Sequence, residues 1–504
     1  MQKPIVTADE AVARIEDGQT VAVGGSGSGH SIAEQLLAAL GRRFRSTGRP
    51  RGLTLVHPFG VGNQKDRGLE HLADPRLVRR VIGGHWSMSP SMARLAAENK
   101  IEAYNLPAGI ISQLLGVSAA GSPGWISEIG LDTFIDPRLQ GGKLNAAAQE
   151  DLVELVRQDG REYLYYKAFP VHVALIRATA ADPAGNLNMD EEVAPWDNCT
   201  MAQAARRWGG IAIAQVKRTA GPEEIDPRSV RVPGIFVDLL VLDPNQGQTF
   251  QIQYDPSLCG AARKRPEEFG VFPLTPRKVI ARRAALELFP GAVINVGFGM
   301  PDGVMKIARE QGLDGEVTNT VEHGQIGGIP AEGLDFGASY NSSSIIETRH
   351  VFNFYHGRGV DLAFLGFAEV DAEGNVNVSR IESAVIGTGG FIDIAQRARR
   401  LVFCGTLAAR GNPKFVPRVK QVTFSGPRAL ADGHEVLYVT EAAVFRLTKA
   451  GVELIEAAPG LSAESEILPR MAFRPAVASP LAGMRAELFR EEPLPISLFR
   501  HFHP

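Results

Sequence analysis

A glutamate in a glycine-dense segment is the position of this sequence best suited to chemistry. Glu322 lies in the run Thr318-Asn-Thr-Val-Glu-His-Gly-Gln-Ile-Gly-Gly-Ile-Pro330, which predicts a strand before the glutamate and a loop after it. An acid at the carboxyl end of a strand in an open α/β sheet points into the crevice where ligands bind. Three roles are open: a salt-bridge partner, a ribose ligand 23 residues after Gly299 (322 − 299), or a nucleophile whose neighbouring glycines admit a bulky substrate.

Three glycine-rich turns supply a second kind of functional group, the backbone amide. They are Gly24-Gly-Ser-Gly-Ser-Gly-His30, Gly297-Phe-Gly-Met-Pro-Asp-Gly303 and Gly387-Thr-Gly-Gly-Phe391. Such turns let N–H groups approach a phosphate, a carboxylate or an oxyanion. A carboxylate accompanied by two turns, Phe298-Gly299 and Gly389-Gly390, favours acyl chemistry.

The glycine motifs with established meanings do not match. A GxGxxG dinucleotide site would need glycine at His30 or at Asp302, and a GxSxG esterase elbow would need glycine at Ser28. Gly141-Gly-Lys143 has neither the upstream glycine nor the following Ser or Thr of a P-loop, and no HExxH occurs. The pattern therefore disfavours an NAD-dependent dehydrogenase. His30, His57 and His85 lie beside glycine or proline turns, and we expect them to be core or surface histidines rather than residues of the cleft.

The elements that must position these residues alternate between short apolar runs and helical patterns. The runs expected to be strands are Val21–Val23, Leu53–Val56, Val173–Ile176, Ile211–Val216 and Ile235–Leu242. Helical spacing occurs at Ser31–Leu40 and at Glu150–Arg157. This alternation predicts an α/β protein with mainly parallel sheets covered by helices.

An internal repeat predicts two homologous open α/β domains in one chain. Asp17–Gly25 resembles Pro290–Phe298 at an offset of 273 residues, and Val173–Asn188 resembles Leu362–Asn377 at an offset of 189. A third pair, Ala204–Val216 with Ala395–Leu407, follows in the same order. The change of offset, 273 − 189 = 84, predicts that many extra residues in the first half. We expect domains at 1–256 and 279–504, joined by a polar, proline-bearing linker at 257–278.

Charge and composition exclude several classes of function. The 504 residues carry 53 basic and 56 acidic side chains, a net charge of −3, so no overall field favours nucleic acid or an anionic membrane. Cys199, Cys259 and Cys404 lie too far apart for a metal motif or a disulfide framework. Neither a secretion signal nor a membrane-spanning apolar run is evident. We expect a cytoplasmic protein with no metal, membrane or nucleic-acid partner.

Over nearly its whole length the sequence resembles the family I coenzyme A transferases, specifically the single-chain acyl-CoA:3-ketoacid, acetate and propionate CoA-transferases. In the first half the resemblance includes KIEAYNLPAGIISQ, DTFIDPRLQGGKLN and YLYYKAFPVHVALIR. In the second half it includes INVGFGMPDGV, VEHGQIGGIPA, DLAFLGFAEVDAEGNVNVS and GTGGFIDIAQ. Together these segments are far more specific than any single glycine turn.

The resemblance implies an active site between two open α/β halves, where Glu322 becomes acylated and then carries CoA as a thioester. It implies oxyanion donors at Phe298 and at Gly389 or Gly390. The substrates would be a short-chain acyl-CoA and a free carboxylic acid, as in ketone-body or short-chain fatty acid metabolism, with CoA as substrate and no bound cofactor. The family tends to form homodimers or homotetramers. Further glycines expected to face substrate or CoA are Gly25, Gly27, Gly299, Gly324, Gly327, Gly328 and Gly387.

Two positions differ from what is common in the family, and two rival functions remain open. Many relatives have Ser or Asn where this chain has His323, and often Phe where it has Ser26. Both changes are expected to alter the acyl pocket. An acyl-CoA hydrolase on the same fold would let water resolve the glutamyl thioester. A non-catalytic ligand sensor would show no turnover.

Overall fold

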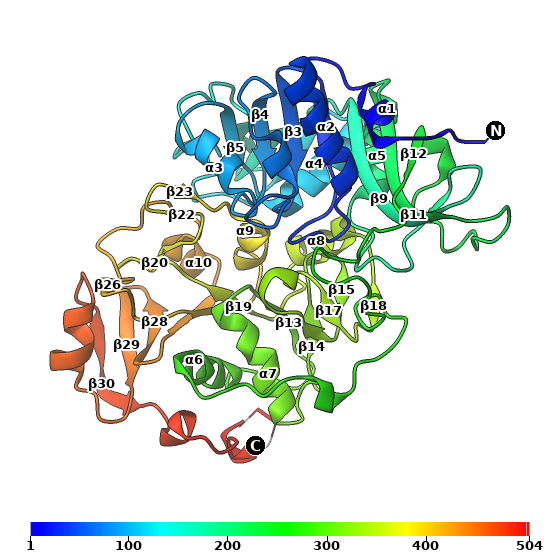
Figure 1. Ribbon diagram of the computed structural model, residues 1–504. Helices are drawn as coiled ribbons and strands as arrows, with labels where there is room; N and C mark the ends of the chain where they lie inside the picture. Colours follow the sequence, from blue (N-terminus) through cyan, green and yellow to red (C-terminus); the bar gives the residue numbers. More distant parts are fainter. Residues whose placement is uncertain (1, 500, 503–504) are drawn as a thin grey trace.

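The chain forms two α/β halves, each built around its own sheet (Figure 1). The structure is a computed structural model and describes residues 2–499 and 501–502. The first sheet is drawn from blue to green in the upper part of Figure 1, and the second from green to red below it. Within the described residues, no helix is both long and apolar enough to cross a membrane.

The first half has a nine-stranded sheet that is parallel except for one short strand. Its order is β1 (Ile5–Val6), β12 (Leu239–Leu242), β11 (Ile211–Thr219), β9 (Val173–Ala181), β2 (Thr20–Val23), β3 (Leu53–His57), β4 (Val78–Gly83) and β5 (Glu102–Asn105), with β10 (Leu187–Asn188) antiparallel to β9. Its helices are α1 (Ala8–Val12), α2 (Glu34–Thr47), α3 (Pro90–Ala97), α4 (Ala108–Ala120) and α5 (Asn198–Arg207). Every residue of β9 is buried, because protein covers both faces of the sheet.

The second half has a ten-stranded sheet with a parallel centre. Its order is β18 (Ser344–Ile345), β15 (Gln325–Ile326), β14 (Thr318–Thr320), β13 (Val293–Val296), β19 (Leu362–Gly366), β24 (Arg400–Cys404), β27 (Glu435–Val439), β28 (Ala443–Thr448), β29 (Gly451–Ala457) and β30 (Ala476–Gly483). Its helices are α6 (Pro276–Ala285), α7 (Gly303–Glu310), α8 (Thr348–His356), α9 (Phe391–Ala395) and α10 (Gly426–Ala431). The two-stranded sheets are β16 (Ile329–Pro330) with β17 (Ser339–Tyr340), β20 (Glu369–Val370) with β21 (Val376–Asn377), β22 (Arg380–Ile381) with β23 (Ala384–Val385), and β25 (Ala408–Ala409) with β26 (Asn412–Pro413).

The strand order confirms the internal repeat. The five parallel strands β3-β2-β9-β11-β12 of the first sheet have the same order as β14-β13-β19-β24-β27 of the second. The repeated DPAGN and DAEGN segments close equivalent hairpins, β9–β10 and β20–β21. Between β3 and β9 the first half also contains β4, β5, α3, α4 and a three-stranded sheet of β6 (Gly124–Ser127), β8 (Arg161–Lys167) and β7 (Val153–Gln158).

Two of the expected elements are corrected. Residues 150–157, predicted as a helix, contain β7, because Asp159 and Gly160 adopt φ values of 51° and 75° and close a tight hairpin with β8. A two-residue Asp-Gly turn of this kind favours a hairpin over a helix. The strand predicted at 235–242 is only β12, since the residues after Pro233 form a 3₁₀ turn, Gly234–Phe236.

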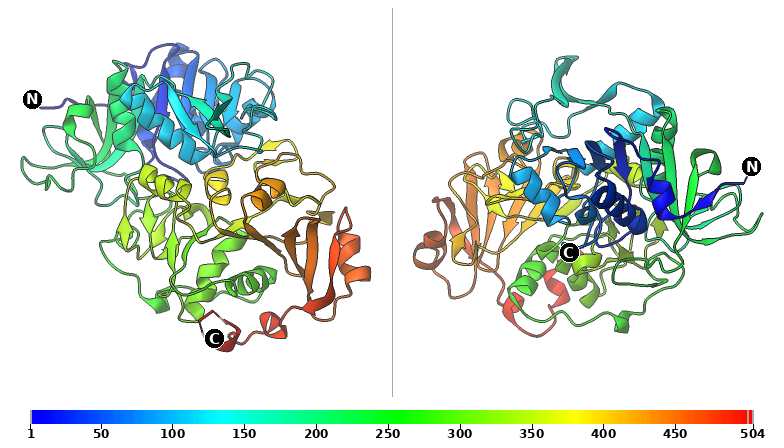
Figure 2. Two further views of the ribbon diagram at one scale, coloured as in Figure 1. Left: turned by 180° about the vertical axis from the view of Figure 1, so that it is seen from behind. Right: turned by 45° about the horizontal axis from the view of Figure 1, so that its top comes forward.

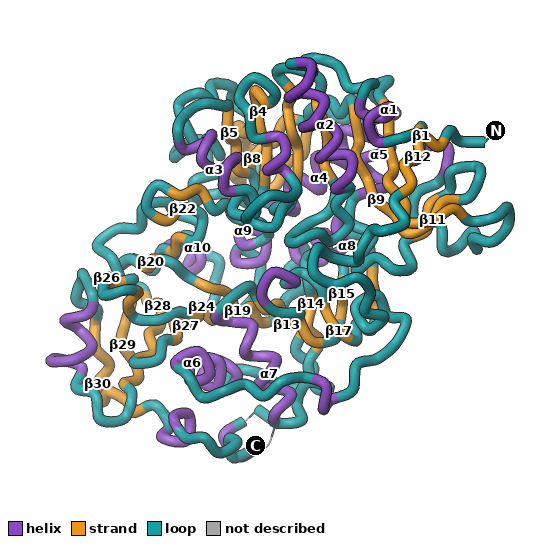
Figure 3. The backbone as a smooth tube through the Cα atoms, in the orientation of Figure 1, coloured by secondary structure: helices purple, strands orange, loops and turns teal. Residues whose placement is uncertain are grey.

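The two halves share apolar contacts where they meet. Phe59, Ala108 and Trp196 of the first half belong to the same buried cluster as Phe352 and Ala395 of the second. Helices α8 and α9, coloured yellow-green to yellow, lie between the two sheets in Figures 1 and 2. Loops fill much of the remaining space between the sheets in Figure 3. The segment after residue 256 also contributes to the core, through Leu258 and Phe272.

Candidate active site

A cavity of about 330 Å³ lies between the halves and is lined by residues of both. Much of its wall comes from the carboxyl ends of parallel strands and the segments that follow them, as expected for an open α/β sheet. In the first half, β2 leads into Ser26 and Gly27, β3 into Phe59 and Gly60, and β4 into His85, Ser87 and Met88. In the second half, β13 leads into Gly297 and Phe298, β14 leads into Glu322 and His323, and β19 ends at Gly366. The carboxyl edges of the two related sheets therefore meet at one cavity.

Glu322 is on the wall of this cavity, in the turn that ends β14. The turn closes through the Val321 amide, which donates to the Gln325 carbonyl at 2.8 Å. Gly324, two residues after Glu322, has a φ of 130°, and a Cβ there would collide with the backbone of Ile346. The Glu322 carboxylate has no hydrogen-bond or ion-pair partner among residues 2–499 and 501–502, so the salt-bridge role has no partner there.

The surroundings of Glu322 disfavour the ionised form of its carboxyl group. Burial raises the pKa of Glu322 to about 7, and the nearby Asp393 carboxylate adds to the rise. The side chain nevertheless keeps part of its surface open toward the cavity. A desolvated carboxylate with a pKa near neutrality is a stronger nucleophile than an ordinary surface glutamate.

The turn that precedes α9 lies against the Glu322 carboxyl group. A Cβ at Gly390 would be 3.2 Å from the Glu322 carboxyl carbon, which only glycine avoids without displacement. The Gly389 amide already donates to the Gly84 carbonyl at 2.8 Å. The Gly390 amide has no acceptor among the described residues and is the available donor of the pair.

Phe298 follows β13 at the mouth of the cavity. Its side chain is 60% exposed and lies edge-on to Phe336, with ring centroids 5.3 Å apart. No acceptor for its backbone amide occurs in the part of the chain that the structure describes. Phe298 thus places an apolar ring and a free N–H group at the same wall as Glu322.

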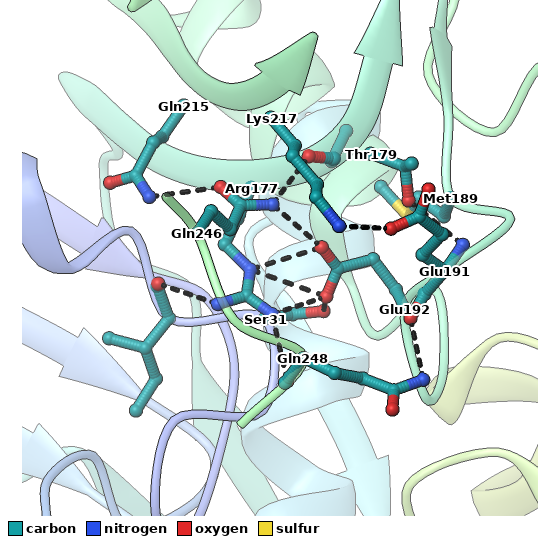
Figure 4. Close-up of polar contacts among 12 residues, drawn as sticks. Ser31, Arg177, Thr179, Met189, Glu191, Glu192, Gln215, Lys217, Gln246 and Gln248 are labelled. Atoms are coloured by element: carbon teal, nitrogen blue, oxygen red, sulfur yellow. Dashed lines mark hydrogen bonds and ion pairs between the residues drawn. The ribbon is translucent and has the colours of Figure 1, made fainter. Parts of the chain in front are cut away.

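The first glycine turn is held by a buried ion pair shown in Figure 4. Arg177 Nη2 and Glu192 Oε2 are 2.7 Å apart, and both side chains are almost completely buried. Ser31 Oγ donates to Glu192 at 2.6 Å, and Gln246 Nε2 donates to the same carboxylate at 3.1 Å. This network fixes the end of the turn, so that its Ser26 and Gly27 line the cavity.

His323 connects the two halves beside Glu322. Its Nδ1 lies 2.7 Å from the Gly337 carbonyl oxygen, and its Nε2 lies 3.3 Å from Ser26 Oγ. Since a carbonyl only accepts, Nδ1 carries the proton and Nε2 accepts from Ser26. The rings of Phe59 and Trp196 pack on the imidazole, each with its centroid 4.4 Å away. Burial lowers the pKa of His323 to about 4, so the ring is neutral at physiological pH.

Comparisons with known proteins agree with this geometry. The family model for coenzyme A transferase matches residues 5–243. The sequence is 42% identical to the acetate CoA-transferase YdiF of Escherichia coli (strain K12), over 96% of this chain and 95% of that one. The chain belongs to the coenzyme A transferase family.

Two further relatives support the assignment. The caffeate CoA-transferase of Acetobacterium woodii is 39% identical over 97% of both chains. A crystal structure of the E. coli O157:H7 acyl-CoA transferase YdiF, described as a thioester complex with CoA, has a TM-score of 0.92 at 41% identity and covers 98% of this chain and 97% of that one. The predicted fold and the predicted activity, transfer of coenzyme A, are confirmed, and coenzyme A is a substrate of the enzyme.

The predicted site residues fall into two groups in this transferase. Glu322, Phe298, Gly27, Gly387, Gly389 and Gly390 line the cavity. Five glycines lie outside its lining: Gly25, Gly299, Gly324, Gly327 and Gly328. Gly324 serves the turn itself, and a Cβ at Gly328 would collide with the backbone of Tyr340.

Sequence reasoning missed several residues of the site. His85 was expected in the core or on the surface, yet it lines the cavity, whereas His30 and His57 are buried behind it. Burial lowers the pKa of His85 to about 4. Phe59 and Asp393 carried no signal in the sequence, because their neighbours at the site belong to distant segments of the chain.

Proposed function

We propose that the enzyme moves CoA from a short-chain acyl-CoA to a free monocarboxylic acid through a covalent intermediate on Glu322. The observation that carries the proposal is the unpartnered Glu322 carboxylate, which faces the cavity between the halves while the Gly390 turn packs on it. The thioester described for the E. coli structure supports the covalent route. A near-balanced exchange of one thioester for another needs no external energy source.

The proposed reaction has two stages. The Glu322 carboxylate attacks the thioester carbonyl, and the C–S bond breaks to give an acyl-glutamyl anhydride and CoA thiolate. The thiolate then attacks the glutamyl carbonyl and releases the donor carboxylate, which leaves a glutamyl-CoA thioester. The acceptor carboxylate repeats these steps in reverse order and leaves as the new acyl-CoA. Covalent catalysis of this kind divides one difficult exchange into easier steps.

We assign oxyanion stabilisation to the Phe298 and Gly390 amides. Both belong to residues on the wall of the cavity, and neither amide has an acceptor among the described residues. Preorganised N–H donors of this kind typically contribute about 10²–10³ in rate each. The choice of Gly390 over Gly389 follows from the bond between the Gly389 amide and Gly84.

The walls of the cavity support small, singly charged acids as substrates. Phe59, Met88, Leu365 and Ile394 make much of the lining apolar, and the lining includes no Lys or Arg. A second carboxylate on the acyl group would therefore lose its hydration without gaining a counterion. The volume of about 330 Å³ is at the small end of ligand pockets.

Chemical trapping tests the proposal directly. The enzyme is incubated with acetyl-CoA in the absence of acceptor, treated with borohydride and digested. We expect the peptide that contains Glu322 to be reduced to the alcohol, and the Glu322→Gln variant to give no such product. An unmodified Glu322 peptide from active enzyme would remove Glu322 from the mechanism.

Steady-state kinetics test the order of the steps. When donor and acceptor are varied together, double-reciprocal plots should be parallel, because the first product leaves before the acceptor is used. Intersecting lines would indicate a ternary complex. Release of CoA at the same rate without acceptor would indicate an acyl-CoA hydrolase.

Assembly and domain limits complete the proposal. We propose a cytoplasmic homodimer or homotetramer that acts in short-chain fatty acid or ketone-body metabolism, as the family resemblance implies. We also propose domains at 1–256 and 279–504 with a linker at 257–278. In limited proteolysis, cleavage within the linker should occur earlier in time than cleavage within β9 or β19. The mass of the native enzyme in solution should be two or four times that of the chain.

A further inference from the structure

A carboxylate that the proposed reaction does not use lies directly behind the Gly389–Gly390 turn. Asp393 is in α9, three residues after Gly390, and is completely buried. One of its oxygens is 2.8 Å from Nε2 of His356, at the end of α8. The other accepts from the Gly109 amide at 3.1 Å. A fully buried carboxylate with donors on both oxygens is held in one orientation.

These contacts join the two halves at the site. Gly109 belongs to α4 of the first half, and the amide of its neighbour Ala108 donates to the Gly389 carbonyl at 2.9 Å. The start of α4 therefore binds both the turn and the first part of α9. Free amides at a helix start favour such acceptors, and negative charge in particular. Gly109 has no room for a side chain, because a Cβ would meet both Asp393 and the ring of Phe352.

We propose that Asp393 is a positioning residue for the transferase reaction: it locks the Gly389–Gly390 turn onto α4 and places a second carboxylate behind Glu322. The inference rests on the proposed nucleophilic role of Glu322 and adds a residue that touches no substrate. Asp393 acts through geometry, by fixing the turn, and through its negative charge.

The charges around Glu322 support the electrostatic part. Asp393 is the nearby charge that, after burial, raises the pKa of Glu322. Two histidines and two tyrosines near the two carboxyls have pKa values shifted toward their neutral forms. Burial lowers the pKa of His323 and of His85, and it raises the pKa of Tyr166 and of Tyr355. Burial raises the pKa of Asp393, and the hydrogen bond to His356 of α8 opposes that rise and favours the ionised form.

The Asp393→Asn variant tests this role through the pH profile of kcat/KM. Asparagine keeps the shape and a carbonyl oxygen for the Gly109 amide, but it removes the charge. A nearby like charge disfavours the ionised form of a carboxyl group, so removal of the Asp393 charge should move the acidic limb to lower pH, and the limb should stay above pH 4.5 because burial is the larger cause. The loosened turn should also lower kcat more than it changes KM.

Asp371→Asn is the matched control. Asp371 is also buried, but it accepts hydrogen bonds from Glu373 and Asn375 of the β20–β21 turn and from the Val419 amide, and it does not line the cavity. Its acidic limb should coincide with that of the parent enzyme. A limb that stays in place in Asp393→Asn, or that moves to higher pH, overturns the proposal, as does an equal shift in the control.

A second pair of variants decides the matter if Asp393→Asn does not fold. His356→Leu removes the donor that favours ionised Asp393 and should also shift the limb downward. His356→Gln keeps an N–H group and should leave the limb closer to that of the parent. Equal profiles for the two variants would overturn the proposal.

Borohydride trapping separates this inference from the proposed function. If the parent enzyme gives a labelled Glu322 peptide and the acidic limb of the kcat/KM profile does not move in Asp393→Asn, the role of Asp393 is rejected and Glu322 remains the nucleophile. An unlabelled Glu322 peptide in the parent enzyme rejects both.

Discussion

Equivalent positions of the two halves carry different residues into the same cavity. Strands β3 and β14 occupy matching places in the two sheets, beside β2 and β13. The segment after β14 supplies Glu322, whereas the segment after β3 supplies Phe59. Phe59 is 4% exposed and packs on His323, the residue after the glutamate. One half thus contributes the carboxylate that we propose as the nucleophile, and the other contributes an aromatic ring to the same cavity.

The difference separates residues that cost stability from residues that provide it. Burying the Glu322 carboxylate without a partner opposes folding wherever the group is ionised. Burying the Phe59 ring between His323 and Trp196 favours folding. We therefore expect substitutions at the two positions to have opposite effects on stability and unequal effects on activity.

The largest expected effect is the loss of transfer in Glu322→Gln. Without a nucleophilic carboxylate, kcat should fall by at least about 10³-fold, while the melting temperature does not fall. Glu322→Asp retains the charge but withdraws it by one methylene, which should cost about 100-fold. The measurement is steady-state transfer from acetyl-CoA to propionate.

Glu332→Gln provides the control for the nucleophile. Glu332 is on the surface near the same cavity, where it pairs with Lys306. Its variant should transfer at close to the parent rate. Equal losses in the two variants would show that the charge of this region, rather than Glu322 itself, supports activity.

The second largest effect is on stability, from Phe59→Ala. Removing a buried aromatic ring should lower the free energy of unfolding by about 3–5 kcal/mol, seen as a shift of the denaturation midpoint. Phe298→Ala removes an exposed ring of the same cavity and should change stability by less than about 0.5 kcal/mol. If Phe59→Ala were as stable as Phe298→Ala, the wall formed by the first half would have no structural role.

The third effect is the pH dependence of activity. Because the proposed nucleophile is ionised Glu322 and burial raises its pKa to about 7, we expect kcat/KM to fall about tenfold per pH unit below pH 7. His323 and His85, with pKa values of about 4, should add no step above pH 5. An acidic limb near pH 4.5 would show an ordinary, hydrated glutamate.

The same pKa shift has a consequence for stability. A carboxyl group whose pKa is higher in the folded state stabilises the protein below its ordinary pKa of 4.5, and that contribution is lost as the pH rises through about 7. Glu322→Gln has no ionisable group at this position, so its stability does not decrease over this pH range for this reason. Its melting temperature relative to the parent should therefore increase between pH 4.5 and pH 7 and stay higher above. A constant difference across that range would contradict the shift.

The smallest expected effect is at Ser26, whose side chain makes one hydrogen bond to the other half, with His323. Ser26→Ala removes the donor to His323 Nε2 and should cost about 0.5–1.5 kcal/mol, or roughly 2- to 10-fold in kcat/KM. Ser87→Ala is the control, because this cavity serine makes no side-chain hydrogen bond to the residues described here. The measurement is kcat/KM of both variants with a panel of free acceptor acids of increasing size. Indistinguishable profiles would remove the Ser26–His323 pair from substrate selection.

The sequence alone was sufficient for features that depend on local pattern. Apolar periodicity located the central strands, and the repeated segments predicted two related sheets, because buried parallel strands need continuous aliphatic residues wherever they occur. The same pattern placed Glu322 at the end of a strand and the glycine turns near it. It was wrong for residues 150–157, where a two-residue turn at Asp159 and Gly160 selects a hairpin over a helix.

Tertiary structure alone decided how these parts combine. The bond from Gly109 to Asp393 joins residues 284 positions apart, and the bond from Ser26 to His323 joins residues 297 apart. The bond between Gly389 and Gly84, which leaves Gly390 as the free donor, also crosses between the halves. Neither partner of such a contact alters the local pattern around the other, so no single segment of sequence reveals it. The chemistry of Glu322 arises from this packing, because the burial that raises its pKa exists only when both sheets enclose it.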